Sequence, residues 1–154
     1  MKKFLIITLT LIVFNAFAKE PNHYVCIDLD NQEYVVNFTH RSVFESPVLK
    51  ISKGAHTIVP KNPFTHNTRY DYQNTLFGQL VTAATSHKFV ADEAEKTFGL
   101  FIPKIILDDH DTSGVKFESI LMIGSSGGFQ PIPVVVQNIE ELVKLECTAS
   151  RVIF

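Results

Sequence analysis

The densest group of side chains that could do chemistry is a run of acidic residues beside a histidine. Asp109, His110 and Asp111 directly follow Asp108, so three carboxylates and one imidazole share a short segment. Carboxylate oxygens bind hard cations such as Ca²⁺, and an imidazole extends the choice to transition metals. We therefore treat this segment as a candidate metal site, and as the centre of a metal-dependent hydrolase in one interpretation. Because acidic residues are also common turn formers, a solvated turn is the main alternative.

A second candidate site lies in the polar stretch 60–74. It contains His66, Arg69, Tyr70 and Tyr72 among asparagines and prolines, and no sustained hydrophobic period runs through it. Rigid aromatic rings mixed with adaptable polar groups are typical of recognition surfaces, and long loops are often functional. The sequence predicts a loop here that binds a protein partner or a small ligand. The alternative is a loop that packs its rings onto the rest of the domain.

Several motifs of catalytic metal sites are absent from the sequence. No His-Glu-x-x-His sequence occurs, and the six histidines and two cysteines show none of the paired spacings of a zinc site. These observations favour a non-catalytic binding domain, and we expect no cofactor.

The two cysteines lie near the two ends of the chain. Cys26 and Cys147 are 121 positions apart, so a bridge between them would close most of the protein into one loop. On the chain-entropy model such a bridge contributes about 5 kcal/mol, a large share of a typical total of about 5 to 15 kcal/mol. An oxidising compartment would permit this bridge. The alternative is two buried free thiols.

The first 18 residues have the form of a bacterial signal peptide. Lys2 and Lys3 precede the uncharged run Phe4–Phe14, and Ala16-Phe17-Ala18 has the small-x-small pattern of a cleavage site. Cleavage would leave residues 19–154, with 12 of the 14 basic residues against 16 acidic ones, a net charge of −4. An acidic balance argues against a nucleic-acid partner. We expect a periplasmic or secreted protein with no transmembrane helix in its mature chain.

Short runs typical of β-strands, separated by turn formers, occupy most of residues 19–154. Segment 92–96 fits either one or two helical turns or a charged turn between strands, and segment 138–141 resembles a helix start. We predict one all-β domain, an antiparallel β-barrel or β-sandwich with at most one or two short helices. The expected strands are 24–29, 33–39, 47–52, 56–59, 76–85, 98–107, 115–123 and 143–150.

The last expected strand has the most regular alternation. Val143, Leu145 and Cys147 alternate with polar residues, so Cys147 is predicted to point inward. First and last strands can be neighbours in a barrel or a sandwich, which a bridge to Cys26 requires. The runs 98–107 and 115–123 should form a hairpin closed by the acidic segment. A small outer-membrane barrel is a further alternative, because the length allows eight short strands.

Overall fold

The computed structural model describes residues 22–39, 48–90, 94–108, 114–126 and 134–151. Within these ranges nine strands and one helical turn form a single all-β domain, as predicted. The proposed signal peptide, residues 1–18, lies outside the described residues. The elements are β1 (His23–Asp28), β2 (Tyr34–Thr39), β3 (Val48–Lys53), β4 (His56–Val59), β5 (His66–Asn74), β6 (Gly78–His87), β7 (Glu95–Pro103), α2 (Lys104–Leu107), β8 (Val115–Ser126) and β9 (Ile139–Ser150).

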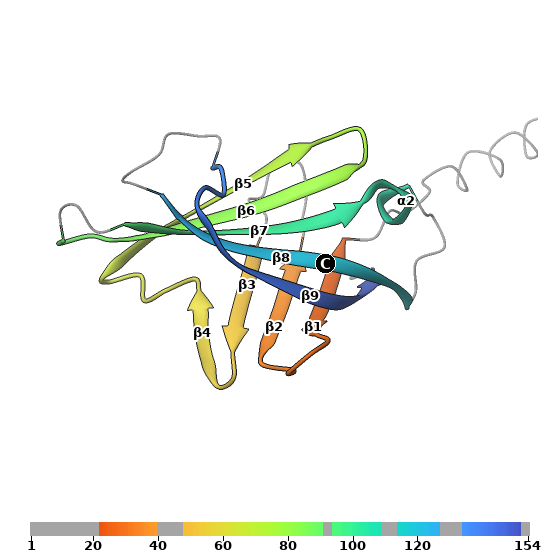
Figure 1. The fold of residues 1–154 in the computed structure, drawn as a ribbon, viewed down its shortest axis with the longest axis horizontal. Coiled ribbons are helices and arrows are strands. Elements are labelled where there is room, and N and C mark those ends of the chain that lie inside the picture. The colour runs from red at the N-terminus through yellow and green to blue at the C-terminus, as the bar shows by residue number, and fades with distance from the viewer. Residues whose placement is uncertain (1–21, 40–47, 91–93, 109–113, 127–133, 152–154) are drawn as a thin grey trace, which may run out of the picture.

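The nine strands form one antiparallel sheet in the order β4-β3-β2-β1-β9-β8-β7-β6-β5. The first and last strands pair with each other, while β4 and β5 end the sheet as its two edges. The short strands β1–β4 run across the long strands β5–β9 in Figure 1. The sheet therefore curls into a nearly closed barrel, which decides between the barrel and the sandwich.

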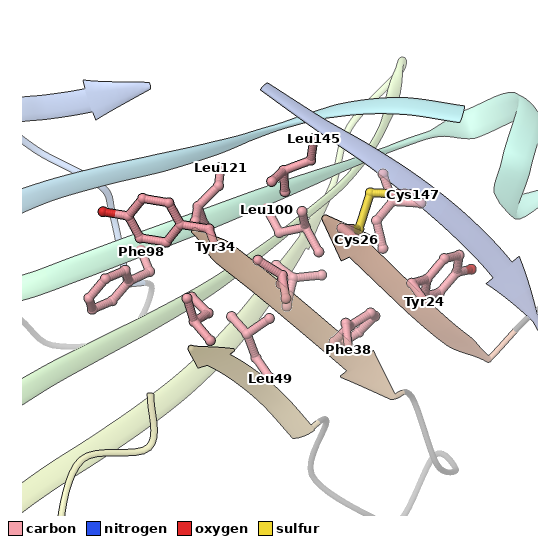
Figure 2. Packing of buried hydrophobic residues seen from close by; sticks show 14 of the residues in the cluster. Tyr24, Cys26, Tyr34, Phe38, Leu49, Phe98, Leu100, Leu121, Leu145 and Cys147 are labelled. Atoms are coloured by element: carbon pink, nitrogen blue, oxygen red, sulfur yellow. A yellow bond between two sulfur atoms is a disulfide. The ribbon is translucent and has the colours of Figure 1, made fainter. Parts of the chain in front are cut away.

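The hydrophobic core fills the space between these two sets of strands. Along β2, Tyr34, Val36 and Phe38 are buried, and the intervening residues are only partly buried, as the two-residue period of a strand requires. Figure 2 shows the side chains of Phe98 and Leu100, from the long strands, in the same cluster as those of β2.

The disulfide joins the first strand to the last. Cys26 and Cys147 lie directly opposite each other in the β1–β9 register, with their Cα atoms 3.9 Å apart and both side chains fully buried. The sulfur–sulfur bond is visible within the core in Figure 2. The predicted bridge and the inward direction of Cys147 are both confirmed. Such a bond is typical of an oxidising compartment outside the cytoplasm.

A segment between β8 and β9, residues 134–138, covers the outer face of the long strands; we call it the strap. Val134 is fully buried, and its backbone N–H donates to Asp71 Oδ2 of β5 at 3.3 Å. Two glycines make room for the strap. A Cβ on Gly124 would lie 2.2 Å from the carbonyl oxygen of Gln137, and one on Gly99 would lie 2.9 Å from a methyl group of the strap. The long strands are thus buried on both faces here.

The close approach of the strap predicts that Gly124→Ala destabilises the protein. The added methyl group would push against a backbone carbonyl, so we expect the free energy of unfolding to fall by about 1–3 kcal/mol. Urea unfolding monitored by circular dichroism measures this change. Thr57→Ala, on the exposed side of β4, is the control and should have little effect. Equal stability of the Gly124 variant and the wild type would contradict the prediction.

The helix-like segments 92–96 and 138–141 do not form helices where the structure describes them. Glu95 begins β7, and Ile139 begins β9 after Asn138, whose φ is +40°. Pairing with the neighbouring strand β8 outweighs the weak local helix signal in both segments. The one described helix, α2, follows Pro103, where the expected strand 98–107 ends early. Within the described residues, no helix is long and apolar enough to cross a membrane.

The predicted loop over 60–74 is also wrong, because residues 66–74 form β5, which pairs with β6 along its whole length. Only residues 60–65 form an irregular connection from β4. The strand was missed because both of its faces carry polar residues, so no hydrophobic alternation marks it.

Candidate ligand-binding site

The strand character of β5 divides the four predicted binding residues between two faces of the sheet. Successive side chains of a strand point to opposite faces. Tyr70 packs against the core on the inner face, and His66 and Tyr72 share that face by the same parity. Arg69 points to the outer face, where it meets Glu95. The four residues therefore do not form one site.

Tyr72 lines a pocket of about 370 Å³ at the end of the molecule where α2 follows β7; we call it the α2 pocket. The turn between β5 and β6 forms one wall and α2 forms the other. The backbone N–H of Lys104 donates to the carbonyl oxygen of Phe77 at 2.8 Å, so the two walls are tied together. Figure 1 shows α2 beside this end of the β5–β6 hairpin. The pocket is lined by Tyr72, Asn74, Thr75, Gly78, Gln79, Lys104, Leu107 and Asp108.

The β5–β6 turn is held in shape by its own hydrogen bonds. The N–H of Thr75 donates to the carbonyl of Gly78 at 2.7 Å, and the N–H of Gly78 donates to the Thr75 hydroxyl at 3.1 Å. Gly78 has to be a glycine, because a Cβ there would lie 2.1 Å from the carbonyl oxygen of Ile102 on β7. The pocket wall is therefore formed before any ligand binds.

The pocket contains an ion pair and two side-chain amides. Lys104 Nζ lies 2.8 Å from Asp108 Oδ2, and Gln79 Nε2 donates to Asn74 Oδ1 at 3.1 Å. Both charged side chains are more than half exposed, so their pairing contributes at most about 1 kcal/mol. Each of these groups can turn to a ligand at small cost.

Tyr70 lies next to the pocket on the inner face of β5 but is more deeply placed. Burial raises the pKa of its phenol above the ordinary value. Tyr72 lies two residues further along the same face.

His66 belongs to the opposite end of β5. It lies six residues from Tyr72, which corresponds to about 20 Å along a strand. Its ring packs edge-on against that of His87 with a centroid separation of 4.8 Å. Among the described residues, no group of three potential His, Cys, Asp or Glu ligands is close enough to hold a metal ion. Asp109, His110 and Asp111 lie outside those residues, so the metal site stays a prediction.

A buried ion pair on the outer face was not anticipated from the sequence. Arg69 Nη2 of β5 lies 2.5 Å from Glu95 Oε1 of β7, and the Glu95 side chain is only 1% exposed. The Ser126 hydroxyl of β8 donates to Glu95 Oε2 at 3.4 Å. Only the registers β5–β6–β7–β8 bring these residues together, and no local sequence pattern reports them. The network connects three long strands beside the strap.

Ser126 also occupies the serine position of a Gly-x-Ser-x-Gly spacing, Gly124 to Gly128. In hydrolases such a serine is exposed on a sharp turn between a strand and a helix. Ser126 is instead buried at the end of β8, and its hydroxyl donates a hydrogen bond to the carboxylate of Glu95. Its position supports a structural role.

A second pocket, of about 320 Å³, opens where β7 and β8 separate beyond Leu100 and Leu121. The Ser119 hydroxyl donates to the carbonyl oxygen of Phe101 and bridges the gap. Apolar groups dominate the lining, so few polar groups could orient a ligand there. The pocket is lined by Leu29, Phe101, Pro103, Glu118, Ser119, Ile120, Lys144 and Leu145.

Comparison with protein-family models, with curated proteins and with solved structures finds no match to this chain. The α2 pocket is therefore assigned on its geometry and chemistry alone.

Proposed function

We propose that this protein is an exported, non-catalytic β-domain that binds a small polar ligand in the α2 pocket. The observation that carries the proposal is the convergence of Tyr72, two amides and a weakly held ion pair on a preformed wall. Ligand sites are concave, largely preformed and contain a few polar groups that fix orientation. The N-terminal leader pattern and the Cys26–Cys147 bridge support export.

The chemistry of the pocket fits a ligand with several hydroxyl or amide groups. The amides of Asn74 and Gln79 can each donate and accept hydrogen bonds. Lys104 and Asp108 can complement groups of opposite charge, and the half-exposed Tyr72 ring offers a flat surface. Sugars and amino acids both match this set of contacts.

Removal of one pocket amide tests the proposal. A panel of monosaccharides and free amino acids is screened by ligand-observed NMR, and the affinity of each binder is then measured by calorimetry. Gln79→Leu should weaken binding by about 5- to 150-fold, because a ligand group that loses its hydrogen-bond partner costs about 1–3 kcal/mol.

The matched control is Gln73→Leu. Gln73 lies on the neighbouring strand β5, on the face opposite to the pocket, so this variant should bind as the wild type does. A panel without a single binder would contradict the proposal, and so would an equal loss of affinity in both variants.

A protein partner at the same end is the second candidate. Phe77 and Ile105 flank the pocket, and they are 79% and 77% exposed. Large apolar side chains held this far into solvent mark interaction surfaces. Ile105→Ser should then weaken binding of the protein partner and leave small-ligand binding in the pocket unchanged.

A further inference from the structure

We propose that the second pocket, which opens between β7 and β8, binds an amphipathic monocarboxylate such as a medium-chain fatty acid. We call it the β7–β8 pocket. The inference goes beyond the proposed function, because this pocket and the α2 pocket are lined by different residues. It rests on the gap between the two strands, on the apolar lining and on the charge of Lys144.

The gap between β7 and β8 begins where their backbone pairing ends. Their register stops at Leu100 and Leu121, although both strands continue beyond this pair. Figure 1 shows β7 and β8 spreading apart toward α2. Pro103 has no N–H to donate to a neighbouring strand, and α2 begins directly after it. The sheet therefore opens here, while β7 stays paired with β6 and β8 stays paired with β9.

Apolar side chains from four strands or their ends surround the gap. Phe101 and Pro103 of β7 and Ile120 of β8 point to the outer face of the sheet, because the residues next to them in sequence point into the core. Leu145 of β9 points inward and lies behind the gap, and Leu29, just after β1, completes the apolar lining. Such a lining leaves the hydroxyl groups of a polar ligand without partners, whereas it stabilises an apolar chain.

The backbone of β8 directs a hydrogen-bond donor into the gap. Ile120 lies opposite Lys144 in the β8–β9 register, and the carbonyl of Lys144 accepts the N–H of Leu29. The backbone groups of Lys144 therefore point toward β1, and those of its partner Ile120 point the other way, toward β7. At this level of β7 the carbonyl of Phe101 accepts the hydroxyl of Ser119. The N–H of Ile120 is thus placed to donate to a ligand.

Lys144 supplies a positive charge beside this donor. It forms a non-hydrogen-bonded pair with Ile120, the kind of pair in which the side chains of two strands come closest. The Lys144 side chain is exposed, and it forms no ion pair with any residue that the structure describes. The carboxylate of Glu146, the next outward residue on β9, is bound by Lys116 at 2.8 Å. A carboxylate head group would pair with Lys144 and accept the N–H of Ile120.

Glu118 limits the charge of the head group. Its exposed side chain lines the pocket and lies opposite Glu146 of β9. A second negative charge on the ligand would be repelled by these carboxylates. We therefore assign the pocket to a monocarboxylate and not to a dianion such as a phosphate monoester.

A series of straight-chain carboxylates tests the role of the apolar tail. Binding of hexanoate, octanoate and decanoate is measured by calorimetry at concentrations below micelle formation. Each added methylene should tighten binding about two- to fourfold, because the pocket removes it from water. Equal affinity along the series, or the absence of saturable decanoate binding, would overturn the proposal.

Reversal of one charge tests the head group. Lys144→Glu should weaken decanoate binding at least about tenfold, because it replaces an attracting charge by a repelling one, and it should leave binding of decanol unchanged. Lys50→Glu, at an exposed position of β3, makes the same charge change and should bind decanoate as the wild type does. An equal loss in both variants, or tighter binding of decylamine than of decanoate by the wild type, would overturn the assignment.

Backbone amide signals in NMR locate the site and separate it from the α2 pocket. Decanoate should shift the signals of Glu118 and Ile120 and leave those of Asn74 and Thr75 unchanged. Gln79→Leu should bind decanoate as the wild type does, so failure of this proposal and failure of the proposed function are distinguishable. Shifts confined to the α2 pocket would overturn the inference.

Discussion

Replacement of both Cys26 and Cys147 by alanine is expected to lower the free energy of unfolding by about 3–5 kcal/mol. The bridge spans 121 positions, so its loss frees nearly the whole unfolded chain. It also joins β1 to β9, the pair of strands that connects the two halves of the sheet. We therefore expect the double variant to have a small remaining stability or to be unfolded at physiological temperature.

Denaturant unfolding of the double variant and the wild type measures this difference. Thr148→Ala, a neighbouring change on β9 that leaves the bridge intact, is the control and should cost less than about 1 kcal/mol. Mass analysis before and after alkylation, without reduction, tests the bond itself. Alkylation of both cysteines in the purified protein, or unchanged stability of the double variant, would contradict the prediction.

Replacement of Arg69 by methionine is expected to destabilise the protein by about 3–5 kcal/mol, because it leaves the buried carboxylate of Glu95 without its cation. The double variant Arg69→Met/Glu95→Met should regain much of the loss. Apolar residues of similar volume often replace a buried ion pair at little cost.

The surface ion pair between Lys96 and Glu140 provides the matched control. Its two side chains are close to half exposed, so Lys96→Met should change stability by less than about 1 kcal/mol. Thermal and urea unfolding of the wild type, Arg69→Met, Glu95→Met and the double variant together give the coupling energy between Arg69 and Glu95. A double variant that is no more stable than Arg69→Met alone would contradict the prediction.

The two faces of β5 have different contacts. On the outer face, Arg69 forms the ion pair with Glu95, and Asp71 accepts the backbone N–H of Val134. Tyr70 and Tyr72 face the core and the α2 pocket. Substitutions on the outer face should therefore act on stability, and substitutions of Tyr72 should act on ligand binding.

Strands with one apolar face were predictable from the sequence. In β2 and β9 the alternation of apolar and polar residues marks the buried face directly, and the structure confirms it for Tyr34, Phe38, Leu145 and Cys147. Burial of apolar area is the main driving force of folding, and the two-residue period of a strand records it locally.

The edge strand and the helix-like segments were not predictable in this way. Residues 66–74 carry polar groups on both faces, and they are extended because β6 supplies their hydrogen-bond partners. Glu95 lies in a locally helix-like run, yet β8 draws it into a strand. Such pairings depend on partners distant in the chain, which local propensity does not include.

The sequence by itself therefore determined an all-β domain, the alternation of its core strands and the inward direction of Cys147. Tertiary structure alone decided that Tyr72 shares a pocket with Lys104, whereas Arg69 faces Glu95 on the other side of the sheet. The physical reason is that the hydrophobic period of a strand specifies its buried face only where one face is apolar and the other is polar. In a polar edge strand, the register of the neighbouring strands assigns each side chain to its face.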